Sequence, residues 1–547
     1  MDRKKGKVDM QPDFADPVAL QILWRRLVSI TDHADRVLGR TAFSQVVRES
    51  HDYVTALLDT EGRSIAQCSQ SIASFIGSLP LAAKEFLRKY PLESLEPGDV
   101  LFTNDAAIGT GHLFDALTLT PVYRGGEVVA FTGNVIHLPD VGGRPLTADA
   151  PDIFEEGIRV PILKLCKADS PNQDVLDVIA ASVRMPEEVL GDIASGVAAN
   201  AAMAREVGTL LDEYDLPNLR GIAKEVCFRS REAMKAAIRA LPDGQYGAEV
   251  SLDGFDEEVR IRNAVEISGD RIHVDYTGTT GQVPYGINVM PHYRRAHALY
   301  AVKCLVDPHT PNNEGCFEPI TDSAPEGCIL NPLPPAACNA RNLIGHLIPR
   351  GIFRALAELL PQRIPADSGS EPGWLVTCVG AAGGHTRRVN TQFIFGGQGA
   401  RPGLDGNDTT AFPSNCKSTS AEVFEQVMPV RVLRKELVAG SGGGGQFRGG
   451  LGQCWEVENV GTSDILFYLG TGGVRHPAQG LRGGLEGETG AVRLDGEAIF
   501  GMGTIVVRPG HRLELQTPGG GGWGLPSDRS KEAERQDLVL GLVEVSG

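Results

Sequence analysis

The sequence of 547 residues contains no run of about 18 uninterrupted apolar residues, so we expect no transmembrane helix. Its ten cysteines are scattered singly and form no CxxC pair. That pattern is typical of reduced, buried thiols rather than of a disulfide framework or a zinc ribbon. The first residues, MDRKKGKVDMQPDF, are basic but lack the apolar stretch of a secretory signal. These absences together predict a cytoplasmic protein.

Basic residues are too few for a protein that binds nucleic acid through its charge. The chain has 52 Lys and Arg against 69 Asp and Glu, a formal net charge of −17. An acidic balance disfavours both a nucleic-acid partner and docking to an anionic membrane surface. The charge therefore predicts neither a nucleic-acid nor a membrane partner, and it fits a chain whose partners are another protein and a small-molecule substrate.

Two well-known motifs for nucleotide binding and hydrolysis are also missing. The stretches SGGGG at 441–445 and PGGGGWG at 518–524 could cradle a phosphate through backbone N–H groups. Neither matches G-x-x-x-x-G-K-[ST], and neither leads into a helix. The favoured interpretation is that both are loops in a β-rich region. The chain has no G-x-S-x-G elbow, which weakens an α/β-hydrolase interpretation.

Glycine, by contrast, is in excess, at 66 of 547 residues or about 12%, against a typical ~7%. Without a collagen period, this excess indicates many tight turns and loops. Hydrophobic periodicity predicts an α+β fold of several domains, with mixed β-sheets and helical layers. We expect helices over 17–48, 79–90, 293–306 and 342–360, and two or three more between 175 and 241. Strands are expected over 53–58, 64–67, 117–123, 128–135, 247–252, 258–267, 272–276, 465–469 and 503–507.

The same patterns divide the chain into four regions. Residues 1–174 form an N-terminal α+β region, and 175–245 form a helical segment. Residues 246–368 form an α+β middle region, and 369–547 form a glycine-rich β region. The tail from 527 is charged and then apolar, and the sequence leaves a short helix and a strand equally open there.

A repeated spacing marks the candidate site. His112 and Asp115 form one H-x-x-D segment, and His137 and Asp140 form a second. The two β-type runs between them flank residues 124–127 (RGGE), which predict a hairpin turn. Because a hairpin returns the chain to where it began, the two H-x-x-D segments should lie side by side.

Two imidazoles and two carboxylates in one place are a ligand set suited to divalent Zn, Mn or Fe. Asp52, at the start of an early β-type run, is a candidate additional ligand. The alternative is that these are loop histidines and capping aspartates, because H-x-x-D alone is a weak pattern. His346, His385 and His476 are isolated in the sequence and are interpreted as surface or core histidines. The charged segment at 155–159 (EEGIR) either orients ligands and binds substrate or is a solvated turn.

A series of motifs runs through the chain in a fixed order: HDYVTALLDTEG, GDVLFTNDAAIGTGHLFDALTLTPVY, GNVIHLPDVGG, FEEGIRVPILKL, VDYTGTTGQVPYGIN, KCLVDPHTPNNEGCFEPI, APEGCILNPLPPAA, FGGQGARPGLDGND, EVFEQVMPVRVLRKEL, GSGGGGQFRGGLG and TPGGGGWGLPSDR. From about residue 13 to 529 these motifs resemble the B subunit of hydantoinase/oxoprolinase proteins. Three segments depart from the usual family pattern: NDAAIGTGHLFD stands for NDPYxGGTHLPD, HLPDVGG stands for HHADVGG, and ADSGSEPGWLV stands for the common ASxGTMN. The departures alter the wall that faces the substrate, so no particular substrate is predicted.

The resemblance implies an activity. Members include ATP-dependent N-methylhydantoinases, oxoprolinases and caprolactamases, and related subunits of acetone and acetophenone carboxylases. An A-type partner binds ATP and phosphorylates the substrate, and the B-type chain carries a divalent metal and completes the reaction. The resemblance places the metal ligands on Asp52, His112, Asp115 and His137, and makes Asp140 either an extra ligand or a residue that supports the ligands. For the chemistry of ring opening, we expect His137 and Asp140 to deliver or remove protons. The resemblance predicts a hydrolase of cyclic amide C–N bonds. A ketone carboxylase subunit and a non-catalytic scaffold are the alternatives.

Overall fold

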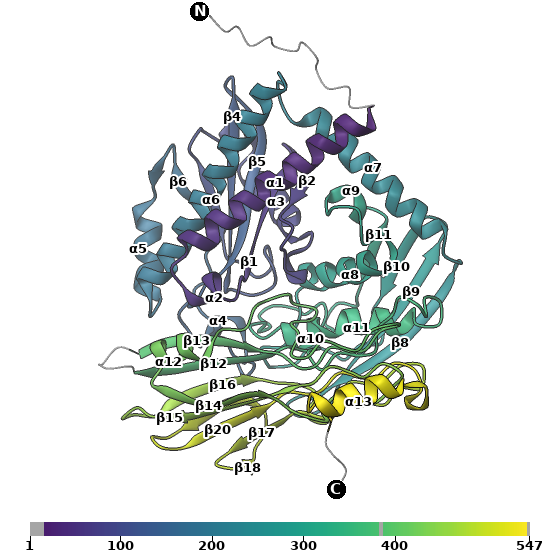
Figure 1. Ribbon diagram of the computed structural model, residues 1–547. Coiled ribbons are helices and arrows are strands. Elements are labelled where there is room, and N and C mark those ends of the chain that lie inside the picture. Colours follow the sequence, from purple (N-terminus) through teal and green to yellow (C-terminus); the bar gives the residue numbers. More distant parts are fainter. Residues whose placement is uncertain (1–15, 382–386, 544–547) are drawn as a thin grey trace, which may run out of the picture.

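The computed structural model describes residues 16–381 and 387–543 (Figure 1). The basic N-terminal stretch, His385 and the last four residues of the tail lie outside these described residues. The predicted fold class is confirmed: helices are layered on four β-sheets that together make an α+β protein. Within the described ranges, no helix is both long enough and apolar enough to cross a membrane. The division into four regions stays a prediction.

The N-terminal part is built on a seven-stranded sheet in the order β2-β1-β5-β4-β3-β6-β7. Its strands are β1 (Tyr53–Leu58), β2 (Ser64–Gln67), β3 (Val100–Thr103), β4 (Asp115–Arg124), β5 (Glu127–His137), β6 (Leu163–Lys167) and β7 (Ser170–Pro171). Gly125 and Gly126 join β4 to β5, and both have positive φ angles, of 60° and 86°. A two-residue turn with positive φ at both positions matches the twist of the strands that it joins. The predicted hairpin is thus confirmed.

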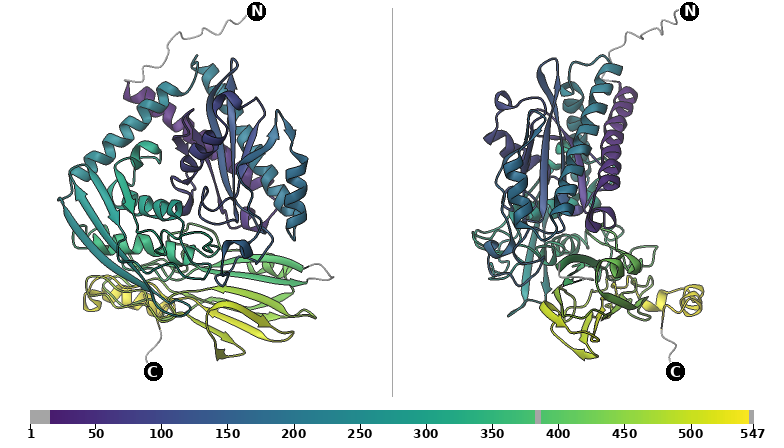
Figure 2. Two further views of the ribbon diagram at one scale, coloured as in Figure 1. Left: turned by 180° about the vertical axis from the view of Figure 1, so that it is seen from behind. Right: turned by 90° about the vertical axis from the view of Figure 1, so that its left-hand side faces the viewer.

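Helices cover both faces of this sheet (Figures 1 and 2). The helices of this part are α1 (Pro17–Thr41), α2 (Gln45–Arg48), α3 (Ser78–Lys89), α4 (Ile153–Glu156), α5 (Gln173–Ser182), α6 (Pro186–Glu213) and α7 (Arg220–Arg239). Helices α1 and α6 pack on one face of the sheet and α3 packs on the other. Along β1, Tyr53 and Leu57 share a hydrophobic core with α1 and α6. Val54 and Leu58, which each follow one of these residues in the strand, share a second core with α3. Alternate side chains of a strand point to opposite faces, so a sheet that is buried on both faces becomes apolar throughout.

The middle part has a four-stranded sheet, ordered β11-β10-β9-β8. Its elements are β8 (Gly244–Leu252), β9 (Val259–Ser268), β10 (Arg271–Asp275), α8 (Pro291–Val306), α9 (Glu314–Phe317), β11 (Ile320–Ser323), α10 (Asn342–Gly345) and α11 (Leu347–Ala355). Helix α11 packs on β8 and β9. The prediction of one helix over 342–360 was wrong, because the segment forms two shorter helices. Pro349 has no N–H to donate back to Gly345, so the helical hydrogen-bond ladder is interrupted there.

The C-terminal part is a sandwich of two sheets, ordered β13-β12-β16-β19 and β14-β15-β20-β17-β18. Its elements are β12 (Trp374–Ala381), β13 (Arg387–Ile394), α12 (Ala421–Val427), β14 (Val430–Leu437), β15 (Gln453–Asn459), β16 (Ile465–Gly470), β17 (Ala491–Leu494), β18 (Glu497–Ala498), β19 (Met502–Val507), β20 (Arg512–Gln516) and α13 (Lys531–Val539). Trp374 and Phe467 from one sheet meet Trp455 and Leu513 from the other in one core. The tail forms the helix α13, which projects from the body in Figure 2.

The glycine-rich loops of this part pack backbone against backbone. The N–H groups of Gly520 and Gly522 donate to the carbonyls of Gly450 and Leu485, both at 2.9 Å. A Cβ atom on Gly449 would lie 1.9 Å from the carbonyl oxygen of Gly520. Chains that approach this closely leave no room for a side chain, which gives the glycine excess a physical cause. These N–H groups form hydrogen bonds within the protein and are therefore not available to bind a phosphate.

Candidate metal centre

Strand ends bring the four predicted metal ligands together. Asp115 begins β4 and His137 ends β5, and the two are direct partners across the hairpin. Asp52 immediately precedes β1, which pairs with β5, and its carbonyl accepts the backbone N–H of His137 at 3.0 Å. His112 lies in the loop that enters β4. The fold therefore places the ends of three strands and one loop at a single point.

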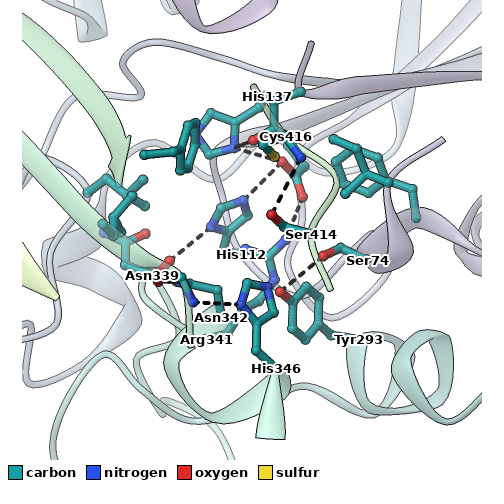
Figure 3. Close-up of a pocket in the computed structure, with 18 of the residues that line it drawn as sticks. Ser74, His112, His137, Tyr293, Asn339, Arg341, Asn342, His346, Ser414 and Cys416 are labelled. Carbon is teal, nitrogen blue, oxygen red and sulfur yellow. Dashed lines mark hydrogen bonds and ion pairs between the residues drawn. The ribbon is translucent and has the colours of Figure 1, made fainter. Parts of the chain in front are cut away.

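The side chains of these residues lie close together, and Figure 3 shows His112 and His137 among the residues that line the pocket. His112 Nε2 lies 2.9 Å and His137 Nδ1 lies 3.2 Å from the same oxygen, Asp115 Oδ1. Asp52 Oδ2 lies 3.6 Å from His137 Nδ1. Ligand atoms from His112, Asp115 and His137 all lie within 4.8 Å of one another, and all three residues are buried. One ion of ordinary size could contact every member of this group.

The protonation of His112 tests whether the group suits a cation. Its Nδ1 lies 3.0 Å from the carbonyl oxygen of Asn339, which can only accept, so Nδ1 carries the proton. Burial, reinforced by the charge of Arg341, lowers the pKa of His112 to about 4, so the ring is neutral at neutral pH. Nε2 is then a bare lone pair, and it is buried with no hydrogen-bond partner among the described residues. Nε2 faces the carboxylate of Asp115. A divalent cation between these two atoms would accept an electron pair from each of them.

The two carboxylates of the group differ in their electrostatics. Burial by itself would raise the pKa of Asp115, but contacts with His112, Arg341 and His137 outweigh it and hold the pKa well below its usual range. Burial raises the pKa of Asp52 to about 6, and the neighbouring His137 offsets only part of this effect. Asp115 is therefore ionised at neutral pH. Burial disfavours the ionised form of Asp52, and a cation bound beside Asp52 would stabilise that form.

Arg341 holds the remaining oxygen of Asp115. Its guanidinium donates to Asp115 Oδ2 at 2.7 Å and to the carbonyl of Thr110 at 2.8 Å. The guanidinium carbon lies 4.2 Å from the ring centre of Tyr293, in a cation–π contact. Gly111, at φ 99°, permits this approach, because a Cβ there would lie 3.1 Å from both Arg341 and Tyr293. The carboxylate is thus fixed with Oδ1 turned toward the two histidines.

A pocket opens beside the group, and all four predicted ligands contribute to its wall. One part of the wall is apolar and consists of Ile72, Phe75, Leu146, Leu375, Phe393 and Phe395. Another part is polar and includes Ser74, Tyr293, Asn339, Arg341, Asn342 and His346 (Figure 3). Such a mixed lining is typical of sites that bury a small molecule and orient it with a few polar groups.

Sequence reasoning missed most of the polar wall. His346, interpreted as an isolated histidine, is buried in the pocket, where its Nδ1 accepts the N–H of Gly373 at 3.3 Å. Burial lowers its pKa well below the usual range, so its ring is neutral. Asn339 and Arg341 reach the site from a segment more than two hundred residues after His112. The polar run NARN, set in an otherwise apolar stretch at 339–342, was the one signal that could have indicated them.

Asp140, the second carboxylate that the hairpin was expected to bring to the site, belongs neither to the group of His112, Asp115 and His137 nor to the wall of the pocket. The carboxylate of Asp140 accepts from the guanidinium of Arg184 at 2.6 Å and from the N–H of Gly142 at 3.2 Å. Its predicted part in proton transfer stays a prediction. In the segment 155–159, Glu155 forms an exposed pair with Arg144.

Glu156, by contrast, is completely buried. One of its oxygens accepts the backbone N–H groups of Cys338 and Asn339, both at 2.6 Å. Since the carbonyl of Asn339 receives the proton of His112, Glu156 helps to fix a candidate ligand. In this segment, Glu156 therefore helps to orient a candidate ligand, whereas the side chain of Glu155 is exposed to solvent.

Comparison with known proteins gives a consistent result. The model of the family described as hydantoinase B/oxoprolinase matches residues 16–526. Caprolactamase subunit beta of Pseudomonas jessenii is 29% identical over 561 residues, which cover 97% of this chain and 95% of that protein. The crystal structure of ATP-dependent caprolactamase from the same organism has a TM-score of 0.88 at 27% identity, with the same coverage of both chains. Nucleotide-free acetone carboxylase has a TM-score of 0.86 at 17% identity, covering 96% of this chain and 78% of the other, and shares the fold.

Proposed function

The chain belongs to the hydantoinase B/oxoprolinase family, and from this premise we propose that it is the metal-binding B-type subunit of an ATP-dependent cyclic amide hydrolase. In this proposal an A-type partner phosphorylates the substrate with ATP, and the present chain completes the opening of the ring at its C–N bond. The observation that carries the proposal is the buried group of His112, Asp115 and His137, with the bare Nε2 of His112 facing a carboxylate beside a pocket. Similarity to an ATP-dependent caprolactamase over nearly the whole chain supports the choice of reaction.

Four side chains would hold the cation: Asp52, His112, Asp115 and His137. Bound there, a divalent cation supplies Lewis acidity, which polarises an oxygen of the substrate or of water and lowers the pKa of that water. Which of Zn, Mn or Fe is used stays open. Asn339 fixes the ring of His112 through its carbonyl, and Arg341 fixes the carboxylate of Asp115. Both contacts keep the coordinating atoms of His112 and Asp115 directed at one point before the cation binds.

His137 is the candidate proton carrier. Its Nδ1 faces Asp115 and Asp52, which leaves Nε2 as the ring atom that can exchange a proton with the leaving nitrogen. Asp140 would have to release Arg184 before its carboxylate could take part. The apolar side chains of the pocket wall would contact the carbon atoms of a ring substrate.

The test is a reaction with the partner present. The chain is co-expressed with an ATP-binding A-type subunit, and ring opening of lactams and hydantoins is measured together with ADP release. We expect ring opening that requires ATP and that is lost in His112→Ala. Equal ring opening without ATP would contradict the proposal. Bicarbonate-dependent consumption of a ketone would establish the carboxylase alternative, and a metal-free, inactive complex would establish the scaffold alternative.

A further inference from the structure

His346 carries a free hydrogen-bond donor in the wall of the pocket. Its Nδ1 accepts the backbone N–H of Gly373 at 3.3 Å. A backbone N–H can only donate, so the proton of the neutral ring is on Nε2. Nε2 makes no hydrogen bond with the described residues, and it is not one of their fully buried, unpartnered polar atoms. It therefore keeps accessible surface and an unused proton, on a side chain that lines the pocket (Figure 3).

Two side chains hold Gly373 and thereby fix the direction of this ring. Asn342 lies one helical turn before His346, and its Nδ2 donates to the carbonyl of Gly373 at 3.2 Å. His346 accepts the N–H of the same glycine, which immediately precedes β12. The imidazole is thus anchored to the start of a strand, and its donor is oriented before a substrate binds.

A second unused proton lies near this donor. The hydroxyl groups of Ser74 and Tyr293 share one hydrogen bond at 3.1 Å, so one of their two protons takes no part in that bond. The ring of His297 packs against both Tyr293 and His346, with ring-centre distances of 4.3 and 5.6 Å. The guanidinium of Arg341 is already bonded to the candidate metal group. This side of the pocket therefore offers neutral hydrogen-bond donors.

A phosphoryl group is complementary to such donors. In the proposed function, the substrate reaches this chain with its amide oxygen phosphorylated. The terminal oxygens of a phosphate ester are ionised at neutral pH, and they accept hydrogen bonds without offering a donor. A hydrogen bond to an ionised oxygen is stronger than one between two neutral groups. Burial lowers the pKa of His346 well below its usual range, so its neutral ring binds an oxygen without transferring a proton to it.

We propose that His346 is a substrate-binding residue whose Nε2–H donates a hydrogen bond to a phosphoryl oxygen of the activated substrate. The inference rests on the proposed function, because a phosphorylated substrate is part of that function, and it names the group that the pocket recognises. A ring that has not been phosphorylated has no ionised oxygen to offer. The contact therefore favours the activated substrate over the unactivated one.

The test uses two substitutions that keep opposite halves of the imidazole. His346→Asn keeps an acceptor near the position of Nδ1, and so the bond to Gly373, but has no donor at the position of Nε2. His346→Gln reaches the position of Nε2 with an N–H donor and gives up the bond to Gly373. The dissociation constant of cyclohexyl phosphate is measured by calorimetry with the purified full chain. We expect His346→Asn to bind it roughly ten- to a hundredfold more weakly than wild type, and His346→Gln to bind it nearly as tightly as wild type.

A second ligand and a stability measurement are the controls. Cyclohexanol has the same ring without the phosphoryl group, and it should bind equally to the wild type and to His346→Asn. The unfolding temperature should fall further in His346→Gln than in His346→Asn, because only His346→Gln loses the bond to Gly373. If His346→Asn fails to fold, His346→Phe replaces it, because it keeps a planar ring without either nitrogen and should lose the same affinity.

Three results would overturn the inference: no binding of cyclohexyl phosphate by the wild type, unchanged binding by His346→Asn, or weaker binding by His346→Gln than by His346→Asn. In the last case the ring would act only through Gly373. The metal content of each sample is measured by elemental analysis. A chain without metal whose binding still depends on His346 would contradict the proposed metal centre and leave this inference standing, so the two fail separately.

Discussion

Asp115 and His137 are direct register partners at the open end of the β4–β5 hairpin, with His137 Nδ1 3.2 Å from Asp115 Oδ1. They are 22 residues apart in the sequence, and the hairpin alone brings them together. A pair of hydrogen-bonded strands fixes this separation more tightly than a loop would, so half of the candidate ligand set is positioned by secondary structure. The other members reach the same point from the start of β1 and from the loop before β4.

Removing Arg341 should destabilise the protein most when the metal is absent. Arg341→Met leaves the buried carboxylate of Asp115 without its cationic partner, a loss of about 3–5 kcal/mol for a buried pair. A bound divalent cation would supply part of the missing positive charge. Thermal unfolding with and without a chelator should therefore show a larger loss in the chelated sample.

The control for this experiment is Arg124→Met, which breaks an exposed pair with Asp212 and should cost at most about 1 kcal/mol. The same loss of stability in Arg341→Met with and without chelator would show that Arg341 does not balance the charge of the metal group.

Glu156 should make stability fall as the pH rises. Burial raises its pKa to about 7 from an ordinary 4.5, although the backbone N–H groups of Asn339 and Cys338 oppose the shift. The folded carboxyl keeps its proton between about pH 4.5 and 7 while the unfolded one loses it, so this contribution is full below pH 4.5 and is lost as the pH passes 7. Glu156→Gln removes the titration. The free energy of unfolding of the variant relative to wild type should rise by on the order of 3 kcal/mol between pH 4.5 and 8 in denaturant titrations.

A difference between Glu156→Gln and wild type that is constant over that range would contradict the assignment. The measurement is made on chelated protein, so that metal release does not add a second dependence on pH.

Gly449→Ala should be strongly destabilising, because the new Cβ would lie 1.9 Å from the carbonyl oxygen of Gly520. Two loops would have to separate, and their backbone hydrogen bonds would be lost, so we expect a loss of several kcal/mol, roughly 3 or more. The matched control is Gly208→Ala in α6, where a Cβ meets nothing within 4 Å and should stabilise the helix by about 0.5–1 kcal/mol. Equal unfolding free energies for the two variants would show that close packing is not the cause of the glycine excess.

Local sequence patterns were sufficient to predict local structure, such as turns and strands. The RGGE turn predicted the hairpin, and apolar runs between turn residues predicted the strands β1 and β5. The candidate ligands on these strands could be named for that reason. The tail could not be decided in advance, because its charged and apolar halves suit either structure. Asp537 of α13 pairs with Arg448 from a distant loop, and such tertiary contacts settle the choice.

The polar residues of the pocket wall could not be predicted from these local patterns. Arg341 meets Asp115 across a separation of 226 residues, and Asn339 meets His112 across 227. No periodicity connects such distant positions, and only the packing of the segment 338–346 against the β4 hairpin joins them. An isolated histidine such as His346 looks the same in a sequence whether it lines a pocket or fills a core.

The metal content of the purified protein tests the central claim most directly. Elemental analysis of the wild type is compared with His112→Ala, Asp115→Ala and, as a control, His476→Ala, whose imidazole pairs loosely with Asp253 at 3.7 Å. We predict that the wild type and His476→Ala retain about one divalent ion per chain, and that His112→Ala and Asp115→Ala lose it while remaining folded. Wild-type metal content in both site variants would contradict the account.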